Sequence, residues 1–221
     1  MDVSCLSKGK VVAAIERMAH DVEGNRDYLT ELDSAIGDAD HGINMSRGFA
    51  ALRAKLPSVC DKCIGTILKT VGMTLVSTVG GASGPLYGTA FMYGGNALVG
   101  EECLTLEGVR KCAKAACDGV AKRGGAVPDD KTMLDAMIPV ANYLLSQQAG
   151  SDLETGGWAG VWRSAADAAK DGMESTVPLI ARKGRASFLG ERSIGHIDPG
   201  AASFYLMMES IAQLALEEGE Q

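Results

Sequence analysis

Hydrophobic residues recur at helical spacing along almost the whole chain. Within each stretch the apolar positions lie three or four residues apart, which is the pattern of a helix that buries one face. The stretches run from Val11 to Val22, Leu29 to Ile36, Phe49 to Leu56, Ile64 to Val79, Leu86 to Leu98, Leu106 to Val120, Leu134 to Leu145, Trp158 to Ala169 and Phe204 to Ala215, with Met173 to Ile180 as an extension of the Trp158 stretch or a separate short helix. No stretch alternates apolar and polar residues between turn signals, so we find no strand and predict an all-α fold of roughly eight helices.

Three irregular stretches that contain glycine interrupt the predicted helices. They cover residues 37–42, 80–88 and 183–200. The other connections are short, and no Pro- or Ser-rich linker or internal repeat divides the chain, so we expect a single domain over residues 1–221. Because a helical frame commonly presents functional groups on its loops, we expect chemistry in these three stretches.

The composition is that of a globular protein with a substantial core. Of the 221 residues, 46% are hydrophobic and 22% are charged. The net charge of -7, from 21 basic and 28 acidic residues, argues against broad binding to nucleic acid or to an anionic membrane surface. The sequence shows no run of about 18 apolar residues, and it does not open with a basic stretch followed by an apolar core. We therefore predict a cytoplasmic protein without a membrane span or a secretory signal.

The six cysteines are expected to be reduced thiols, because a cytoplasmic chain of this size does not need a disulfide framework. Cys60 and Cys63 form a Cys-x-x-Cys pair, which could serve zinc or redox chemistry. A zinc site would need a second pair of similar spacing, but the nearest candidates, Cys112 and Cys117, have four residues between them inside a predicted helix. Small side chains at packing positions are therefore the favoured interpretation.

Three aspartates, Asp33, Asp38 and Asp40, lie in or just before the first irregular stretch. On a continuous helix Asp38 would point about 140° away from Asp33, so the three carboxylates converge only if the chain turns. Gly37 and Gly42 would supply the permissive backbone for that turn. Converging carboxylates repel one another unless a hard cation lies between them, and magnesium is the natural candidate. The alternative is that Asp38 and Asp40 cap the following helix, and spacing alone favours neither.

The second irregular stretch is rich in glycine and leads into a predicted helix. Its glycines are Gly80, Gly81, Gly84 and Gly88. Such a turn exposes backbone N–H groups at a helix N-terminus, where the helix dipole also favours an anion such as phosphate. The pattern matches neither the P-loop nor the dinucleotide-binding glycine motif. On these residues alone, a tight turn between two helices is the favoured alternative.

The third irregular stretch concentrates positive charge in an otherwise acidic protein. Arg182 directly precedes it, and Lys183, Arg185 and Arg192 lie within it; residues 182–200 are called the basic loop. Arginine suits bidentate contact with phosphate or carboxylate, so the loop could clamp a nucleotide or dock an acidic partner, whereas a solvated loop is the alternative. Asp198 and Pro199 at its end predict a helix entrance, with Asp198 as the N-cap and Pro199 in the first helical position.

Four motifs occur together in the order in which one known family carries them. They are Gly37 to Gly42, Gly80 to Leu86, Asp130 to Met133, and Gly184 to Ser187 followed by Asp198 to Gly200. This combination resembles the nucleotide-binding L subunit of dihydroxyacetone kinase over almost the whole chain. The resemblance implies an antiparallel eight-helix barrel, open at one end, where loops hold ADP or ATP through two magnesium ions.

The resemblance also implies individual roles. It makes Asp33, Asp38 and Asp40 the magnesium ligands and Arg185 the catalytic residue that meets the charge of the transferred phosphoryl group. The implied nucleotide contacts are His41, Gly42, Ile43, Asn44, Ala82, Ser83, Gly124, Met133, Arg185, Asp198, Pro199 and Gly200. Gly124 and Met133 rest on the resemblance alone, because neither lies in one of the three irregular stretches.

In the family that the chain resembles, the reaction needs partner polypeptides. A separate K subunit holds dihydroxyacetone covalently on a histidine, and the L subunit supplies the phosphoryl group. In one branch ADP stays bound and is rephosphorylated in place by a phosphocarrier M subunit fed from phosphoenolpyruvate, whereas in another branch ATP exchanges. The motifs resemble the first branch more closely, so we expect a retained ADP. Two other interpretations stay open: a phosphocarrier that uses His41 as its phosphate station, and a non-enzymatic, lipid-binding helical barrel.

Overall fold

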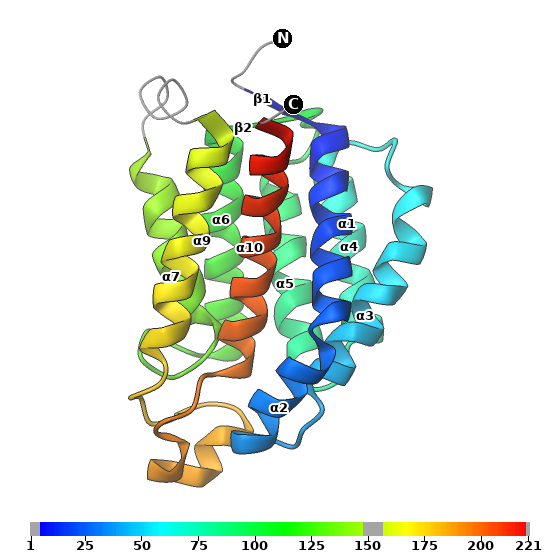
Figure 1. Cartoon of the computed structure of the whole chain (residues 1–221). Coiled ribbons are helices and arrows are strands. Elements are labelled where there is room, and N and C mark those ends of the chain that lie inside the picture. Colours follow the sequence, from blue (N-terminus) through cyan, green and yellow to red (C-terminus); the bar gives the residue numbers. More distant parts are fainter. Residues whose placement is uncertain (1–4, 148–156, 220–221) are drawn as a thin grey trace.

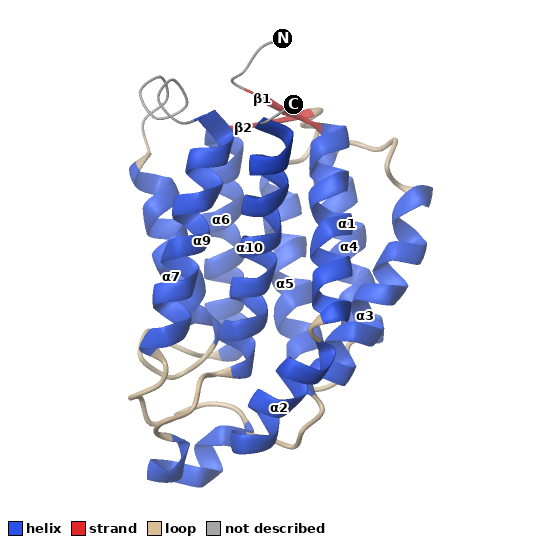
Figure 2. Ribbon diagram, in the orientation of Figure 1, coloured by secondary structure: helices blue, strands red, loops and turns tan. Residues whose placement is uncertain are grey.

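A computed structural model describes residues 5–147 and 157–219, and most of these residues are helical (Figures 1 and 2). The helices are α1 (Lys8–Gly24), α2 (Arg26–Ile36), α3 (His41–Lys55), α4 (Ile64–Thr78), α5 (Ser83–Ala97), α6 (Leu106–Gly124), α7 (Met133–Ser146), α9 (Gly157–Ser175) and α10 (Pro199–Gly219), with short 3-10 segments η1 (Leu56–Ser58) and η2 (Arg185–Ser193). The all-α prediction is confirmed. The opening segment, where we expect no secretory signal, lies partly outside the described residues.

The long helices pack in a cyclic order. Each of α1, α3, α4, α5, α6, α7, α9 and α10 contacts the next, and α10 returns to contact α1. Successive members of this cycle run in opposite directions, as the colour gradient of Figure 1 shows. A cycle of this kind is what the predicted eight-helix barrel requires. Its alternating direction brings the first residues of α3, α5, α7 and α10 to one end of the bundle.

The interior is filled by apolar side chains from every long helix. Ile15 of α1, Phe49 of α3 and Leu75 of α4 are each no more than 2% exposed, and burying such a side chain contributes about 1.5–3 kcal/mol. An apolar cavity of about 250 Å³ remains inside the bundle. No described helix is long and apolar enough to cross a membrane.

Helices α4 and α5 approach so closely that glycine is required where they touch. A Cβ atom on Gly72 of α4 would lie 2.6 Å from the carbonyl oxygen of Gly88 of α5, and one on Gly65 would lie 2.7 Å from that of Gly95. Real Cβ atoms essentially never come this close to backbone. The glycines therefore let the two helices pack backbone to backbone.

Both predicted ends of α6 are confirmed, whereas α5 and α9 differ from the apolar pattern. The Thr105 hydroxyl accepts a hydrogen bond from the Gly108 N–H at 3.1 Å and so caps α6, which ends before Gly125 with its left-handed φ of 58°. Helix α5 begins at Ser83, earlier than its apolar stretch indicates. Helix α9 ends at Ser175. The predicted stretch from Met173 to Ile180 therefore extends α9 only over its first three residues.

Two expectations are wrong at the end of the bundle where α1 begins: that the chain has no strand, and that all six cysteines are reduced. Strands β1 (Cys5–Ser7) and β2 (Cys103–Thr105) pair antiparallel, and they are too short to show the alternation by which a strand is predicted. Their pairing brings Cys5 and Cys103 together in a disulfide with a Cα–Cα distance of 5.9 Å. The two cysteines are 98 residues apart, and such a distant pairing leaves no local signal in a sequence.

The other four cysteines are free thiols, as expected. Burial raises the pKa of Cys112 to about 11 and that of Cys117 to about 12, which makes both unreactive packing residues. The described residues contain no cluster of metal-binding side chains that includes Cys60 or Cys63. The packing interpretation is thus supported for the helical pair, and the Cys-x-x-Cys pair gains no metal-binding partners.

Candidate functional site

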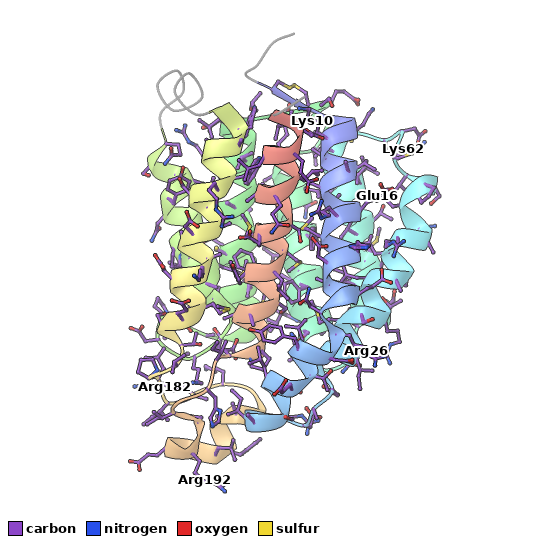
Figure 3. The ribbon with its side chains drawn as sticks, in the orientation of Figure 1. Lys10, Glu16, Arg26, Lys62, Arg182 and Arg192 are labelled. Atoms are coloured by element: carbon purple, nitrogen blue, oxygen red, sulfur yellow. A yellow bond between two sulfur atoms is a disulfide. The ribbon has the colours of Figure 1, made fainter. Side chains whose placement is uncertain are left out.

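Four helices begin at the end of the bundle opposite the disulfide. The first residues of α3, α5, α7 and α10 are His41, Ser83, Met133 and Pro199. In Figure 3, Arg182 and Arg192 mark this end of the bundle, and Lys10 and Lys62 mark the opposite end. Because a helix N-terminus carries partial positive charge, four of them together favour an anion.

The acidic loop between α2 and α3 brings the three predicted aspartates together. One carboxylate oxygen each of Asp33, Asp38 and Asp40 lie within 4.8 Å of one another. Hydrogen bonds to the backbone hold Asp33 in this arrangement. Its Oδ2 accepts from the backbone N–H groups of Asp40 at 2.9 Å and His41 at 3.1 Å. The turn that convergence of the three carboxylates needs is therefore present.

The glycines of this loop serve a different purpose from the one predicted. The left-handed residue of the turn is Ala39, with φ 59°, rather than a glycine. A Cβ atom on Gly37 would lie 1.9 Å from Asp33 Oδ1, and one on Gly42 would lie 2.0 Å from the carbonyl oxygen of Arg26. Gly37 thus leaves room for the Asp33 carboxylate, and Gly42 lets α3 pack directly on α2.

The capping alternative for the aspartates is only half right. Asp40 does occupy the N-cap position of α3, but its side chain makes no capping hydrogen bond. Asp33 supplies the capping oxygen instead, and Asp38 Oδ2 lies 3.0 Å from Arg185 Nη2 in an ion pair. The Asp38 and Asp40 carboxylates are therefore not used as helix caps, and Asp38 is instead paired with the Arg185 guanidinium.

His41 joins three of the helix starts through a buried hydrogen-bond network. It is 7% exposed, with Nδ1 3.0 Å from the Ser83 hydroxyl oxygen and Nε2 3.0 Å from that of Ser203. The Tyr87 hydroxyl lies 2.7 Å from the same Ser203 oxygen. Burial lowers the pKa of His41, which favours the neutral ring. Both ring nitrogens are thus occupied by hydroxyl groups.

The basic loop is a shaped segment rather than a loose one. Its chain takes left-handed φ values at Gly184 and Gly190, of 64° and 57°, and the buried Ser193 hydroxyl accepts from the Ala181 N–H at 2.9 Å. Arg185 extends from the start of η2 toward the acidic loop, where it pairs with Asp38. This loop therefore places a cation directly beside the three aspartates.

Asp198 caps α10 as predicted, and its position makes it easy to protonate. Its Oδ2 accepts from the Ala201 N–H at 2.7 Å. Burial raises its pKa from 3.8 to about 7, although the Ala201 N–H and the nearby Lys131 ammonium favour the charged form. A carboxyl group with this pKa is partly neutral at physiological pH.

These groups surround one cavity of about 360 Å³. Its lining includes every predicted site residue except Gly42 and Ile43. Gly42 is buried against α2, as its contacts require, whereas the Ile43 side chain is 49% exposed. The chain thus gathers acidic, glycine-rich and basic segments that are far apart in sequence around a space that is large enough for a small molecule.

A family model described as the DAK2 domain matches residues 35–213. The chain belongs to the DAK2 domain family.

Similar proteins include two bacterial subunits and one larger kinase. This DAK2 chain is 46% identical over 212 residues to the ADP-binding subunit DhaL of the PEP-dependent dihydroxyacetone kinase of Escherichia coli (strain K12), which covers 96% of this chain and 99% of that protein. It is 40% identical to the corresponding subunit of the PTS-dependent kinase of Lactococcus lactis subsp. lactis (strain IL1403), over 87% of this chain and 90% of that one. The crystal structure of the dihydroxyacetone kinase of C. freundii in its native form matches with a TM-score of 0.71 and 24% identity, over 92% of this chain and 34% of that chain.

The residues that only the resemblance identified have a structural logic in this DAK2 chain. Met133 begins α7 directly after Thr132, whose side chain caps the helix together with that of Asp135. The pattern Thr-x-x-Asp is a helix-start signal, so the sequence itself could have indicated a fourth N-terminus here. Gly124 is the last residue of α6 and lines the cavity.

Three cations of the lining were not singled out as site residues from the sequence. They are Arg123, Lys131 and Lys183. Lys183 belongs to the basic loop, whereas Arg123 lies in the last turn of α6 and Lys131 in the connection to α7. They add to Arg185 in making the surroundings of the cavity favourable to a polyanion.

Proposed function

We propose that this chain is the nucleotide-binding subunit of a dihydroxyacetone kinase, with ADP or ATP in the 360 Å³ cavity. The observation that carries the proposal is the convergence of four helix N-termini and three carboxylates on one cavity. It is supported by the 46% identity to a subunit named as ADP-binding, which extends over 96% of the chain. We further propose that residues 1–221 form one cytoplasmic domain.

The donor set of the acidic loop suits magnesium. The oxygens of three carboxylates lie within 4.8 Å of one another, and Arg185 pairs with one of the three, Asp38. The remaining negative charge favours a further cation, and hard oxygen ligands are what magnesium prefers. Asp33, Asp38 and Asp40 would hold the ions, and we propose two of them. When bound, magnesium supplies charge neutralisation between the carboxylates and the nucleotide phosphates.

The residues of the chain contribute mainly position and charge. The N–H groups at the start of α5 would bind phosphate oxygens, and the Ser83 hydroxyl is held in place for a phosphate contact by His41. Arg185 would leave Asp38, its partner at 3.0 Å, to meet the charge that develops on the transferred phosphoryl group. Phosphoryl transfer of this kind needs no nucleophile from this chain.

The rim of the cavity offers a contact for the protein that presents the acceptor. Phe188 of η2 is 87% exposed, although burying such a side chain contributes about 1.5–3 kcal/mol. It lies on the same short segment as Arg185 and the exposed Arg192. We propose that this segment docks the K subunit that holds dihydroxyacetone, and that an M subunit phosphorylates the bound ADP at the same opening.

The phosphocarrier alternative finds no support in the site. A phosphohistidine needs a ring nitrogen that a donor can reach, but His41 is 7% exposed and both of its nitrogens contact hydroxyl groups at 3.0 Å. The aspartates and helix starts instead fit a bound nucleotide. We therefore propose a retained ADP, which the several charged contacts of the cavity would hold against dissociation, rather than a nucleotide that exchanges with ATP.

The nucleotide content of the purified protein tests this proposal. Protein prepared without added nucleotide and denatured in acid should release ADP or ATP in a ratio close to one per chain, measured by chromatography. Asp38→Ala should abolish tight binding and lower the Tm through the lost ligand linkage. Asp171→Ala, an exposed change on α9, is the matched control. Undiminished ADP affinity of Asp38→Ala in calorimetry with magnesium would contradict the metal assignment.

A further inference from the structure

Lys131, in the connection between α6 and α7, is a lysine that is only 1% exposed. Its ammonium donates to the backbone carbonyl oxygens of Thr176 at 2.7 Å, Val177 at 3.4 Å and His196 at 2.5 Å. An ammonium group has three N–H donors, so all of them are used. A buried ammonium is unfavourable unless its N–H groups are hydrogen-bonded, and here the three carbonyl groups meet that need.

The three carbonyl groups come from two chain segments that meet, residues 176–177 and residues 195–198, and we call this junction the neck. The chain leaves α9 after Ser175 and enters α10 at Pro199, and the intervening basic loop is closed where residues 176–177 meet residues 195–198. The Gly195 N–H donates to the Val177 carbonyl at 2.8 Å, and the Asp198 N–H donates to the Thr176 hydroxyl at 3.0 Å. The Lys131 ammonium adds a third connection, because it bonds Thr176 on one side and His196 on the other.

Arg185 lies in the segment that this neck closes, so the neck fixes where the Arg185 backbone is placed. The Arg185 side chain is 69% exposed, so little packing holds it in place apart from its ion pair with Asp38. The connection that carries Lys131 also accepts from the basic loop through the Asp130 carbonyl, which bonds the Arg182 N–H at 3.0 Å. A displacement of about 1 Å in a group that meets the reacting atoms can cost about 100-fold in rate.

We propose that Lys131 is a positioning residue for phosphoryl transfer, which fixes Arg185 over the acidic loop by joining both sides of the neck. The inference rests on the proposed function for its catalytic consequence, although the hold on the neck does not depend on it. Lys131 also lines the cavity, but its donors are already taken by carbonyl groups, so it acts through the loop and not as a direct phosphate ligand.

The test compares Lys131→Met with the wild type in three measurements. These are kcat and KM in the complete kinase assembly, ADP affinity with magnesium in calorimetry, and amide hydrogen exchange by mass spectrometry. Lys8→Met is the matched control, because Lys8 also donates to a backbone carbonyl, that of Asp61 at 3.1 Å. It is the first residue of α1 and so lies at the other end of the bundle (Figure 1). Lys131→Gln is the conservative variant, since its amide keeps two N–H donors.

For Lys131→Met we expect kcat to fall about 100-fold while KM for the dihydroxyacetone-bearing subunit changes little. Exchange should quicken in residues 177–197 and stay unchanged in α4 and α5, Lys131→Gln should recover part of both effects, and Lys8→Met should show neither. A kcat within twofold of the wild type would overturn the proposal. So would a lost kcat or ADP affinity with unchanged exchange in the loop, which would indicate direct phosphate binding.

Two further outcomes are also decisive. If Lys131→Met does not fold, the same criteria apply to Lys131→Gln, and wild-type kcat and exchange in that variant would overturn the proposal. If the wild-type chain shows no transfer in the assembly, the proposed function fails. The exchange measurement then still decides whether Lys131 holds the neck.

Discussion

The protonation of Asp198 gives a prediction about stability that needs no nucleotide. Burial raises the pKa of this carboxyl from 3.8 to about 7 in the folded chain, so between these values the folded protein binds the proton more tightly than the unfolded protein does. Stability must therefore fall as the pH rises through this window, and the full penalty, about 4 kcal/mol, is present above pH 7. Asp198→Asn removes the charge and keeps an oxygen that can accept from the Ala201 N–H.

The expected result is a stability difference that depends on pH. Urea unfolding of nucleotide-free protein, followed by circular dichroism, should show Asp198→Asn more stable than the wild type at pH 8, by up to about 4 kcal/mol, and within about 1 kcal/mol of it near pH 4. Asp171→Asn, at an exposed position on α9, should show a small difference that does not follow this window. A gap of the same size at both pH values, or a variant that is less stable at pH 8, would refute the reasoning.

Three further predictions concern the site, the rim and the helix packing. Arg185→Ala should lower kcat on the order of 100-fold in the assembled kinase and leave ADP retention nearly intact. Wild-type turnover in this variant would contradict a catalytic role and favour the alternative of a solvated loop. Phe188→Ala should raise KM for the K subunit about 30-fold without changing the Tm, while Val99→Ala, 66% exposed, should change neither; unchanged KM for Phe188→Ala would exclude the rim contact. Gly72→Ala should lower the free energy of unfolding by about 1–3 kcal/mol in urea titrations, because its Cβ would meet the Gly88 carbonyl at 2.6 Å, and stability equal to that of Gly24→Ala, where nothing lies within 4 Å, would contradict this.

The helical frame could be predicted from the sequence because its signals are local. Apolar spacing marks each long helix, and caps such as Thr105 and Asp198 act within a few residues of their own position. The same holds in part for the acidic loop, where the spacing of the aspartates showed that they could converge only if the chain turned but did not decide between a metal site and helix caps. Such features need only the next one or two turns of chain to be correct.

Features that depend on distant contacts could not be read in this way. The Cys5–Cys103 disulfide joins residues that are 98 positions apart, and the sequence near either cysteine does not indicate its partner. The role of Gly42 depends on how closely α3 approaches α2, and Lys131 finds its carbonyl partners between 45 and 65 residues away. A buried lysine surrounded by polar neighbours in sequence is indistinguishable from an exposed one until the loops are placed.

The most direct test of the central claim follows the bound nucleotide through catalysis. The chain is loaded with radiolabelled ADP and magnesium, freed of unbound nucleotide, and mixed with the K subunit, dihydroxyacetone, and the M subunit fed from phosphoenolpyruvate, with excess unlabelled ATP as a chase. The account predicts many molecules of dihydroxyacetone phosphate per chain while the label stays bound. Rapid loss of label, together with turnover that is driven by ATP without the M subunit, would contradict a retained cofactor, and no product under any condition would contradict the proposed function itself.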